Sequence, residues 1–227
     1  FSTVTSGSAS GALALNPGPN TVDVKVTATG GLWTKTYSVN VSTIPAIAGA
    51  GYGAIPDGLG NDSPGAARDI TFTVSGRSGT VSNVLVDFTL NPAHTYSSDV
   101  KAVLIAPDNT QHVVASFAHL NDNSYLAGPY SFSDAASGTL SAALSATNGG
   151  VNVPSGTYRT QNNNETATSL FTTFSGKAPN GTWTLRFTDY YNGDTGSVSA
   201  ANLYLATTTP AAPEIAADRL LAMPEVQ

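Results

Sequence analysis

Asn180-Gly-Thr-Trp-Thr-Leu-Arg-Phe-Thr-Asp189 is the stretch that decides the fold class. Its apolar residues Trp183, Leu185 and Phe187 occupy alternate positions, with Thr or Arg between them. A period of two residues is typical of a strand with one buried face. Turn signals flank the stretch, Asn180-Gly181 before it and Gly193-Asp194 after it. We therefore expect a β-hairpin, closed by a second short strand around residues 203–205.

Asp189 falls on the same alternate positions as the three apolar residues, so its carboxylate should point inward at the end of the strand. A buried carboxylate must be paired with a cation, hydrogen-bonded or bound to a metal. Asp189 is therefore the first candidate site residue.

The composition is that of a turn-rich β protein without disulfides. Of the 227 residues only 11% are charged, 22 are Gly, 13 are Pro and none is Cys. The net charge of −6 argues against a nucleic-acid partner, because nucleic acids bind basic surfaces. Asp accounts for 12 of the 15 acidic residues. Short carboxylates in loops suit a hard cation such as Ca²⁺, although Asp also favours turns through its own backbone hydrogen bonds.

No apolar run approaches the ~20 residues that a membrane-spanning helix needs, so no membrane span is expected. The sequence has no start methionine, and no basic segment followed by an apolar one at its beginning. We therefore expect it to begin inside a longer product or at a processed end.

Residues 1–43 are expected to form three strands, at 12–15, 21–27 and 35–41. Two pieces, Leu15-Asn-Pro-Gly-Pro-Asn-Thr-Val-Asp-Val24 and Lys35-Thr-Tyr-Ser-Val-Asn-Val41, resemble the closing half of a cadherin-like bacterial β-sandwich repeat. The opening half of such a repeat is missing. Because so few strands cannot bury two faces, this partial sandwich must pack on the next domain or take partner strands from another chain.

Residues 44–53 are small, apolar and interrupted by Gly and Pro, and we interpret them as a linker. Short strands are then expected within residues 54–207, at 70–74, 84–90, 100–105, 112–117 and, weakly, 138–144, before the stretch that opens this section. Short strands separated by Gly, Asn, Asp and Pro favour a sandwich or jelly roll. Residues 208–227, which begin with a run rich in Thr, Pro and Ala, are expected to be a tail or linker.

Five pieces of this region, in order, resemble the P domain (P/Homo B) that follows the catalytic domain of proprotein convertases and many bacterial secreted proteases. They are Ile55-Pro-Asp57; His94-Thr-Tyr-Ser-Ser-Asp-Val100 with Leu104-Ile-Ala-Pro-Asp-Asn-Thr110; Phe132-Ser-Asp-Ala135; Gly156-Thr-Tyr-Arg159; and the opening stretch with Gly193-Asp-Thr-Gly196. The sequence departs from the family pattern at Asn109, Ser133, Thr160 and Asn202. Asn109 replaces a turn glycine, and Asn tolerates a positive φ. Ser133 replaces a common aspartate, which removes a possible cation ligand.

The resemblance implies an all-β fold, with a jelly-roll P domain at 54–207 preceded by the partial Ig/cadherin-like β-sandwich. It also implies an accessory function. Such domains stabilise a neighbouring catalytic domain, modulate its calcium and pH dependence, and carry no catalytic residues. The expected parent is a secreted or cell-surface bacterial protein associated with a subtilisin-like serine endopeptidase, whose catalytic domain lies outside these residues. The expected partner is the adjacent catalytic or sandwich domain of that parent.

Calcium is the expected cofactor. Loop positions of a jelly roll gather at one end of the sandwich, where several carboxylates repel one another unless a cation neutralises them. The alternative for each Asp is that it caps a turn or accepts hydrogen bonds from backbone N–H groups. The first-choice ligands are Asp99, Asp134, Asp189 and Asp194, and the second-choice ligands are Asp57 and Asp122.

No catalytic residue is predicted within the sequence. Gly7-Ser-Ala-Ser-Gly11 has the two flanking glycines of a serine-nucleophile motif, but Ala9 stands at the central position and the strand–turn–helix context that the motif requires is missing. His94, His112 and His119 do not form a zinc-binding arrangement, and we expect a structural hydrogen-bonding role for His94. Carbohydrate binding stays open as a lesser alternative, through loop tyrosines Tyr125, Tyr130, Tyr158, Tyr190 and Tyr191.

An alternative function of a different class is a structural or adhesive subunit of an extracellular assembly. Open strand edges in residues 1–43 could accept a strand from a neighbouring chain, and the tail beyond Thr207 could donate it. Self-association through strand edges is the expected consequence.

Overall fold

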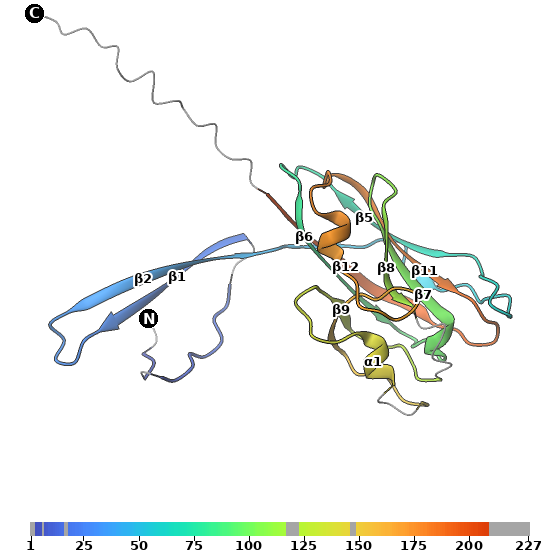
Figure 1. The fold of residues 1–227 in the computed structure, drawn as a ribbon, viewed down its shortest axis with the longest axis horizontal. Coiled ribbons are helices and arrows are strands. Elements are labelled where there is room, and N and C mark those ends of the chain that lie inside the picture. The colour runs from blue at the N-terminus through green and yellow to red at the C-terminus, as the bar shows by residue number, and fades with distance from the viewer. Residues whose placement is uncertain (1–2, 6, 16–17, 117–122, 146–148, 209–227) are drawn as a thin grey trace, which may run out of the picture. The chain divides into compact units, whose positions relative to one another are not determined.

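The computed structural model describes residues 3–5, 7–15, 18–116, 123–145 and 149–208 (Figure 1). Contacts within the chain divide it into two compact units, Phe1–Ala46 and Ile47–Gln227. No helix in the described ranges is long and apolar enough to cross a membrane. The predicted tail lies outside these ranges beyond Thr208.

The first unit contains an antiparallel hairpin of β1 (Gly18–Thr27) and β2 (Thr34–Thr43). Val22 lies opposite Val39 and Val24 opposite Tyr37, so the alternation places these apolar side chains on one face. About half of Val24 (48%) and Tyr37 (50%) is exposed. The strand predicted at 12–15 is not formed, because the segment has no pairing partner within the described residues.

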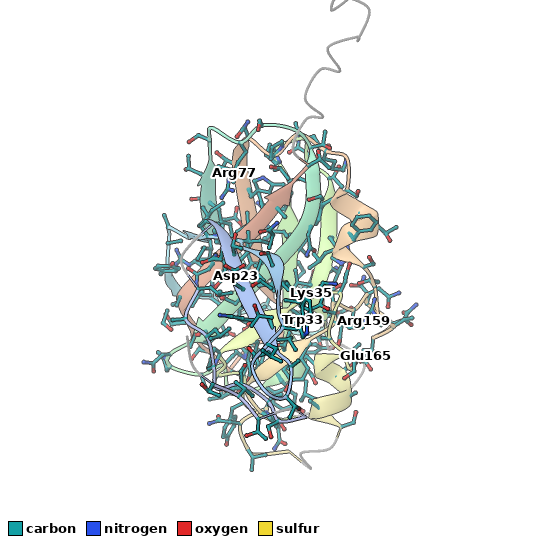
Figure 2. All side chains as sticks on the ribbon, turned by 90° about the vertical axis from the view of Figure 1, so that its left-hand side faces the viewer. Asp23, Trp33, Lys35, Arg77, Arg159 and Glu165 are labelled. Carbon is teal, nitrogen blue, oxygen red and sulfur yellow. The ribbon has the colours of Figure 1, made fainter. Side chains whose placement is uncertain are left out.

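Side chains around the hairpin turn are exposed as well. Trp33 precedes β2 and is 79% exposed, and Lys35 Nζ lies 4.9 Å from the centre of the Tyr37 ring (Figure 2). An isolated two-stranded hairpin is marginally stable in water. The described residues of the first unit by themselves leave its apolar face uncovered.

Among its described residues, the second unit is built mainly of strands, with two short helices and one 3₁₀ turn. The strands are β3 (Ala46–Ala48), β4 (Gly53–Ala54), β5 (Arg68–Val74), β6 (Val81–Leu90), β7 (Val100–Ile105), β8 (Gln111–Ser116), β9 (Tyr130–Phe132), β10 (Gly156–Tyr158), β11 (Gly181–Asp189) and β12 (Ser197–Thr207). The helical elements are η1 (Ser97–Asp99), α1 (Leu140–Leu144) and α2 (Leu170–Phe174).

These strands form two sheets that enclose one core. One sheet has the order β10-β9-β6-β12-β3, with β4 also paired to β12, and the other has the order β5-β11-β7-β8 (Figure 1). β11 is a central strand, because it pairs with β5 on one side and β7 on the other. The predicted all-β sandwich is therefore confirmed.

The core lies where the apolar face of β11 meets the other sheet. Trp183, Leu185 and Phe187 are fully buried, as their alternation predicts. The Phe187 ring meets Phe88 of β6 edge-on, with the ring centres 5.0 Å apart. Trp183 Nε1 donates to Pro179 O at 2.9 Å, so the polar atom of this buried side chain is satisfied.

The predicted hairpin between β11 and residues 203–205 is wrong. β11 belongs to the four-stranded sheet, whereas β12 pairs with β6 in the other sheet. The connection at 190–196 therefore crosses from one sheet to the other. Alternating side chains fix which face of a strand is buried, but they do not fix which strand lies beside it.

The structure differs from the expected elements at two further segments, 44–53 and 138–144. Residues 44–53 are more than a linker, because β3 lies within them and β4 begins at Gly53. The weak strand predicted at 138–144 contains the helix α1, which begins where Thr139 Oγ1 accepts a hydrogen bond from Ala142 N. Asn109 has the positive φ expected of its turn, at 65°.

His112 on β8 should make the stability of the second unit depend on pH. Nδ1 lies 2.7 Å from Thr173 Oγ1, and Nε2 lies 2.8 Å from Thr160 Oγ1. Burial lowers the pKa of His112 from 6.5 to about 4. The unfolded chain therefore takes up this proton at a higher pH than the folded chain, and stability is lost as the pH falls from 6.5 to 4.

Replacing the imidazole should remove this loss. We expect His112→Gln to flatten the fall in unfolding free energy between pH 6.5 and 4, measured by urea unfolding at several pH values. An unchanged slope would show that other groups cause the acid sensitivity.

Candidate functional site

One end of the sandwich collects four of the six predicted cation ligands. β11 ends there, η1 leads into β7 there, and the loops at 55–65 and 190–196 join them. Backbone hydrogen bonds tie these segments together: Gly65 N donates to Asp189 O, and Tyr190 N donates to Asp99 O. We call this region the acidic end, defined by Asp57, Asp99, Asp189 and Asp194.

Asp189 points inward and is paired with His94. Asp189 Oδ2 lies 3.0 Å from His94 Nε2, and both side chains are fully buried. His94 Nδ1 lies 2.9 Å from Tyr96 O, and Asp189 Oδ1 accepts a hydrogen bond from Tyr191 N at 3.0 Å. Tyr96 N also donates to His94 Nδ1 at 3.4 Å, so the imidazole ring is held by the backbone of Tyr96 on one side and by the Asp189 carboxyl group on the other.

Asp99 is buried as well, but it has no such partner in the described ranges. It is 5% exposed, and no hydrogen bond to its carboxylate occurs among the residues that the structure describes. Burial raises the pKa of Asp99 from 3.8 to about 6; the charge on Asp189 raises it too, His94 lowers it, and Asp194 and Asp57 raise it further. A carboxylate in this setting is stabilised by a cation.

Asp99 lines a cavity of about 200 Å³ that opens to solvent. Lys101 supplies a positive charge on the cavity wall, and Asp62 supplies a second negative one. The remaining lining residues are Ser98, Val100, Ser116, Asn163 and Tyr190. The cavity therefore offers oxygen atoms of several kinds around one buried carboxylate.

Asp194 and Asp57 both accept hydrogen bonds that fix the connection at 190–196, which we call the crossing loop. Asp194 Oδ1 accepts a hydrogen bond from Thr95 Oγ1 at 2.7 Å. The two oxygens of Asp57 accept from Gly193 N at 3.1 and 3.2 Å. Each carboxylate has a structural task, and each is close enough to Asp99 to raise its pKa.

The acidic end fits Ca²⁺ in charge and in donor chemistry, since its ligands would be carboxylate, hydroxyl and backbone oxygens. It does not present a finished set of side-chain ligands: within the described residues, no three His, Cys, Asp or Glu side chains gather in metal-binding geometry. Both oxygens of Asp189 are already engaged. Asp99 is thus the strongest candidate ligand, with Asp57 and Asp194 beside it.

Asp134 does not join the acidic end. Its Oδ1 accepts from Leu170 N, and its Oδ2 accepts from Phe171 N and Ser169 Oγ, so it satisfies the start of α2. Asp134 therefore accepts hydrogen bonds from backbone N–H groups, which is the alternative to cation binding. Asp122 lies outside the described residues.

Sequence reasoning missed the partner of Asp189 and the wall of the cavity. His94 was expected to form structural hydrogen bonds, but 95 positions separate it from Asp189 and no spacing rule joins them. Asp62, Lys101 and Asn163 gave no signal at all, because they come together only through the fold.

Gly196 lets the crossing loop pass close to His94. A Cβ at Gly196 would lie 2.6 Å from His94 Cα and 2.7 Å from His94 N, which are backbone atoms that cannot swing away. We expect Gly196→Ala to lower the free energy of unfolding by about 1–3 kcal/mol. Gly138→Ala is the matched control, because a Cβ there meets nothing within 4 Å. Equal unfolding midpoints in urea for the two variants would contradict the close packing.

The second unit belongs to the class of small β-sandwich modules, with the acidic end at one end of the sandwich. The family model of the proprotein convertase P-domain matches residues 82–205. The match covers more than half of the chain, so the chain belongs to this family.

Two solved structures are similar to this chain: the serine protease of Aeromonas sobria and the same protease in complex with a chaperone. The identity is 15% in both comparisons, with TM-scores of 0.36 and 0.37. The alignments cover 82% and 83% of this chain but only 36% and 37% of theirs, so the chain spans little more than a third of their length. Comparison with curated proteins gave no match.

Proposed function

We propose that the chain is a non-catalytic accessory domain that stabilises a subtilisin-like serine endopeptidase of a secreted or cell-surface bacterial protein. The family membership of residues 82–205 is the observation that carries this proposal. The local chemistry agrees with it, because His94 is committed to Asp189 and Tyr96 O rather than to a hydroxyl nucleophile. The peptidase would lie elsewhere in the same parent or in a bound neighbour.

The test compares the parent protein with a variant that lacks residues 47–208. We expect the deletion to shorten the half-life of peptidase activity during heating, because a docked domain slows unfolding. The isolated chain should hydrolyse no peptide substrate. An unchanged half-life, or hydrolysis by the isolated chain, would contradict the proposal.

We further propose that the acidic end binds Ca²⁺ with Asp99 as its main side-chain ligand. The support is a buried carboxylate that opens to a cavity and is surrounded by like charges. A cation that binds only the folded chain stabilises it by about 2.7 kcal/mol at 100-fold over its dissociation constant. This stabilisation would replace the disulfides that the sequence lacks.

Asp99→Asn should separate the destabilising effect of this buried charge from its proposed role in binding Ca²⁺. With a chelator present, we expect the variant to unfold at the same temperature as the native chain or above it, because a buried charge is removed. With Ca²⁺ present, only the native chain should gain stability. The measurement is thermal unfolding together with titration calorimetry.

Asp23→Asn is the control, because it removes the same charge from an exposed position on the hairpin. If Asp99→Asn keeps the full stabilisation by Ca²⁺, the ion binds elsewhere. If the native chain gains nothing from Ca²⁺, the calcium proposal fails while the accessory role stands.

The structural or adhesive alternative is favoured by one observation, the uncovered apolar face of the hairpin. Within the described residues β1 and β2 pair only with each other, so their outer edges could accept another strand. If self-association uses this face, Tyr37→Lys should weaken it.

A further inference from the structure

Three Asn-Gly steps occur in the sequence, at 148–149, 180–181 and 192–193. Asn is a thermolabile residue, and a following Gly offers a backbone nitrogen that no side chain shields. Asn148 lies outside the described residues. The other two steps differ sharply in their surroundings.

The side-chain amide of Asn180 is held by two hydrogen bonds to the backbone of Arg77. Its Nδ2 donates to Arg77 O at 2.7 Å, and its Oδ1 accepts from Arg77 N at 3.0 Å. Gly181 begins β11 and lies opposite Val74 of β5. Neither the amide nor the backbone that follows it can turn to bring Gly181 N onto the Asn180 side-chain carbon.

Asn192 is not held by hydrogen bonds in this way, although its side-chain oxygen lies close to Gly60, where a Cβ would be 2.8 Å from Oδ1. It is exposed in the crossing loop, and its side-chain amide has no hydrogen-bond partner in the described part of the chain. Gly193 has φ of 109°, and a Cβ built there would meet nothing within 4 Å. Side-chain packing therefore does not restrain the backbone at Gly193.

A carboxylate is aimed at the nitrogen that would attack. Gly193 N donates to both oxygens of Asp57, at 3.1 and 3.2 Å. Asp57 can take the proton as Gly193 N forms its new bond, as a general base does. Asn180 has no such carboxylate among the contacts of Gly181.

We propose that Asn192 is a site of spontaneous deamidation promoted by Asp57. Gly193 N attacks Asn192 Cγ, the Cγ–Nδ2 bond breaks, and the proton from Gly193 N leaves with the amide nitrogen as ammonia. Water then opens the cyclic imide at either carbonyl. The products are aspartate, or isoaspartate with the chain continuing through the side-chain carbon.

The modification adds a negative charge beside Asp57 and Asp194. The isoaspartate product also lengthens the backbone of the loop that carries Asp194. The charge change would alter cation affinity at the acidic end, a consequence that rests on the proposed calcium site. The deamidation itself does not depend on that site.

The test is peptide mapping by mass spectrometry after the native chain is aged at neutral pH in ¹⁸O-labelled water. We expect the Asn192 peptide to gain one label from water and the Asn180 peptide to gain none. Aging in urea is the control, because unfolding should allow both steps to react. Equal labelling of the two peptides in the folded chain, or no labelling at Asn192, would overturn the proposal.

Asp57→Asn tests the promoting group. We expect it to slow labelling at Asn192 roughly tenfold or more, with unchanged rates in urea. Circular dichroism checks that the variant is folded, and Asp23→Asn, which removes an exposed charge from the hairpin, is the control. Equal rates for the native chain and Asp57→Asn would remove Asp57 from the reaction. Calorimetry on aged and fresh protein then reports the effect on Ca²⁺ separately.

Discussion

Asp189→Ala is expected to lower the free energy of unfolding of the second unit by about 3–5 kcal/mol, because it leaves the buried His94 without its carboxylate. Both side chains are fully buried, so water cannot take the place of the lost partner. The variant also leaves Tyr191 N without its acceptor. Urea unfolding followed by circular dichroism measures the loss.

The exposed pair of Arg186 with Asp69 is the matched control. Its two hydrogen bonds are 2.7 Å long, shorter than the contact of His94 with Asp189, but both side chains are more than a third exposed. We therefore expect Asp69→Ala to cost about 1 kcal/mol or less. A double variant, His94→Gln with Asp189→Asn, should lose less than the sum of its single variants. Full additivity would contradict the pairing.

Trp183→Ala is expected to cost about 3–5 kcal/mol, because it empties the centre of the core. Trp183 is fully buried, its ring meets Phe174 of α2 edge-on at 5.1 Å, and its indole nitrogen is hydrogen-bonded. A loss of this size is a large part of the stability of a typical domain.

Trp33→Ala makes a matched control, because the only other tryptophan is 79% exposed. We expect it to change stability by about 0.5 kcal/mol or less. Circular dichroism must follow both variants, since each removes one of the two indole fluorophores. A small loss for Trp183→Ala would show that the core is not packed around this ring.

The strand content of the second unit could be predicted because alternation is a local property. The alternate spacing of Trp183, Leu185 and Phe187 is enough to predict that their side chains are buried, as they are in the structure. The partner of β11 could not be predicted in this way. It is chosen by the crossing of residues 190–196 between the sheets, which depends on the close approach of Gly196 to His94.

The same limit applies to the acidic end. Asp189 shares the alternate positions of the buried apolar residues, which predicts that its carboxylate is buried. Its partner His94 lies far away in the sequence and could not be predicted from this spacing. Asp134 shows the opposite case, because a loop Asp near a helix start has the same sequence signal whether it caps the helix or binds a metal. Only the three-dimensional contacts separate these two roles.

The molar mass of the chain in solution tests the account most directly, because it separates an accessory module from an assembly subunit. Light scattering in millimolar Ca²⁺, and again after chelation, gives this mass. We expect 23.1 kDa, one chain, in both conditions. A larger species, above all one that Tyr37→Lys dissociates, would contradict the accessory role and favour assembly through the hairpin.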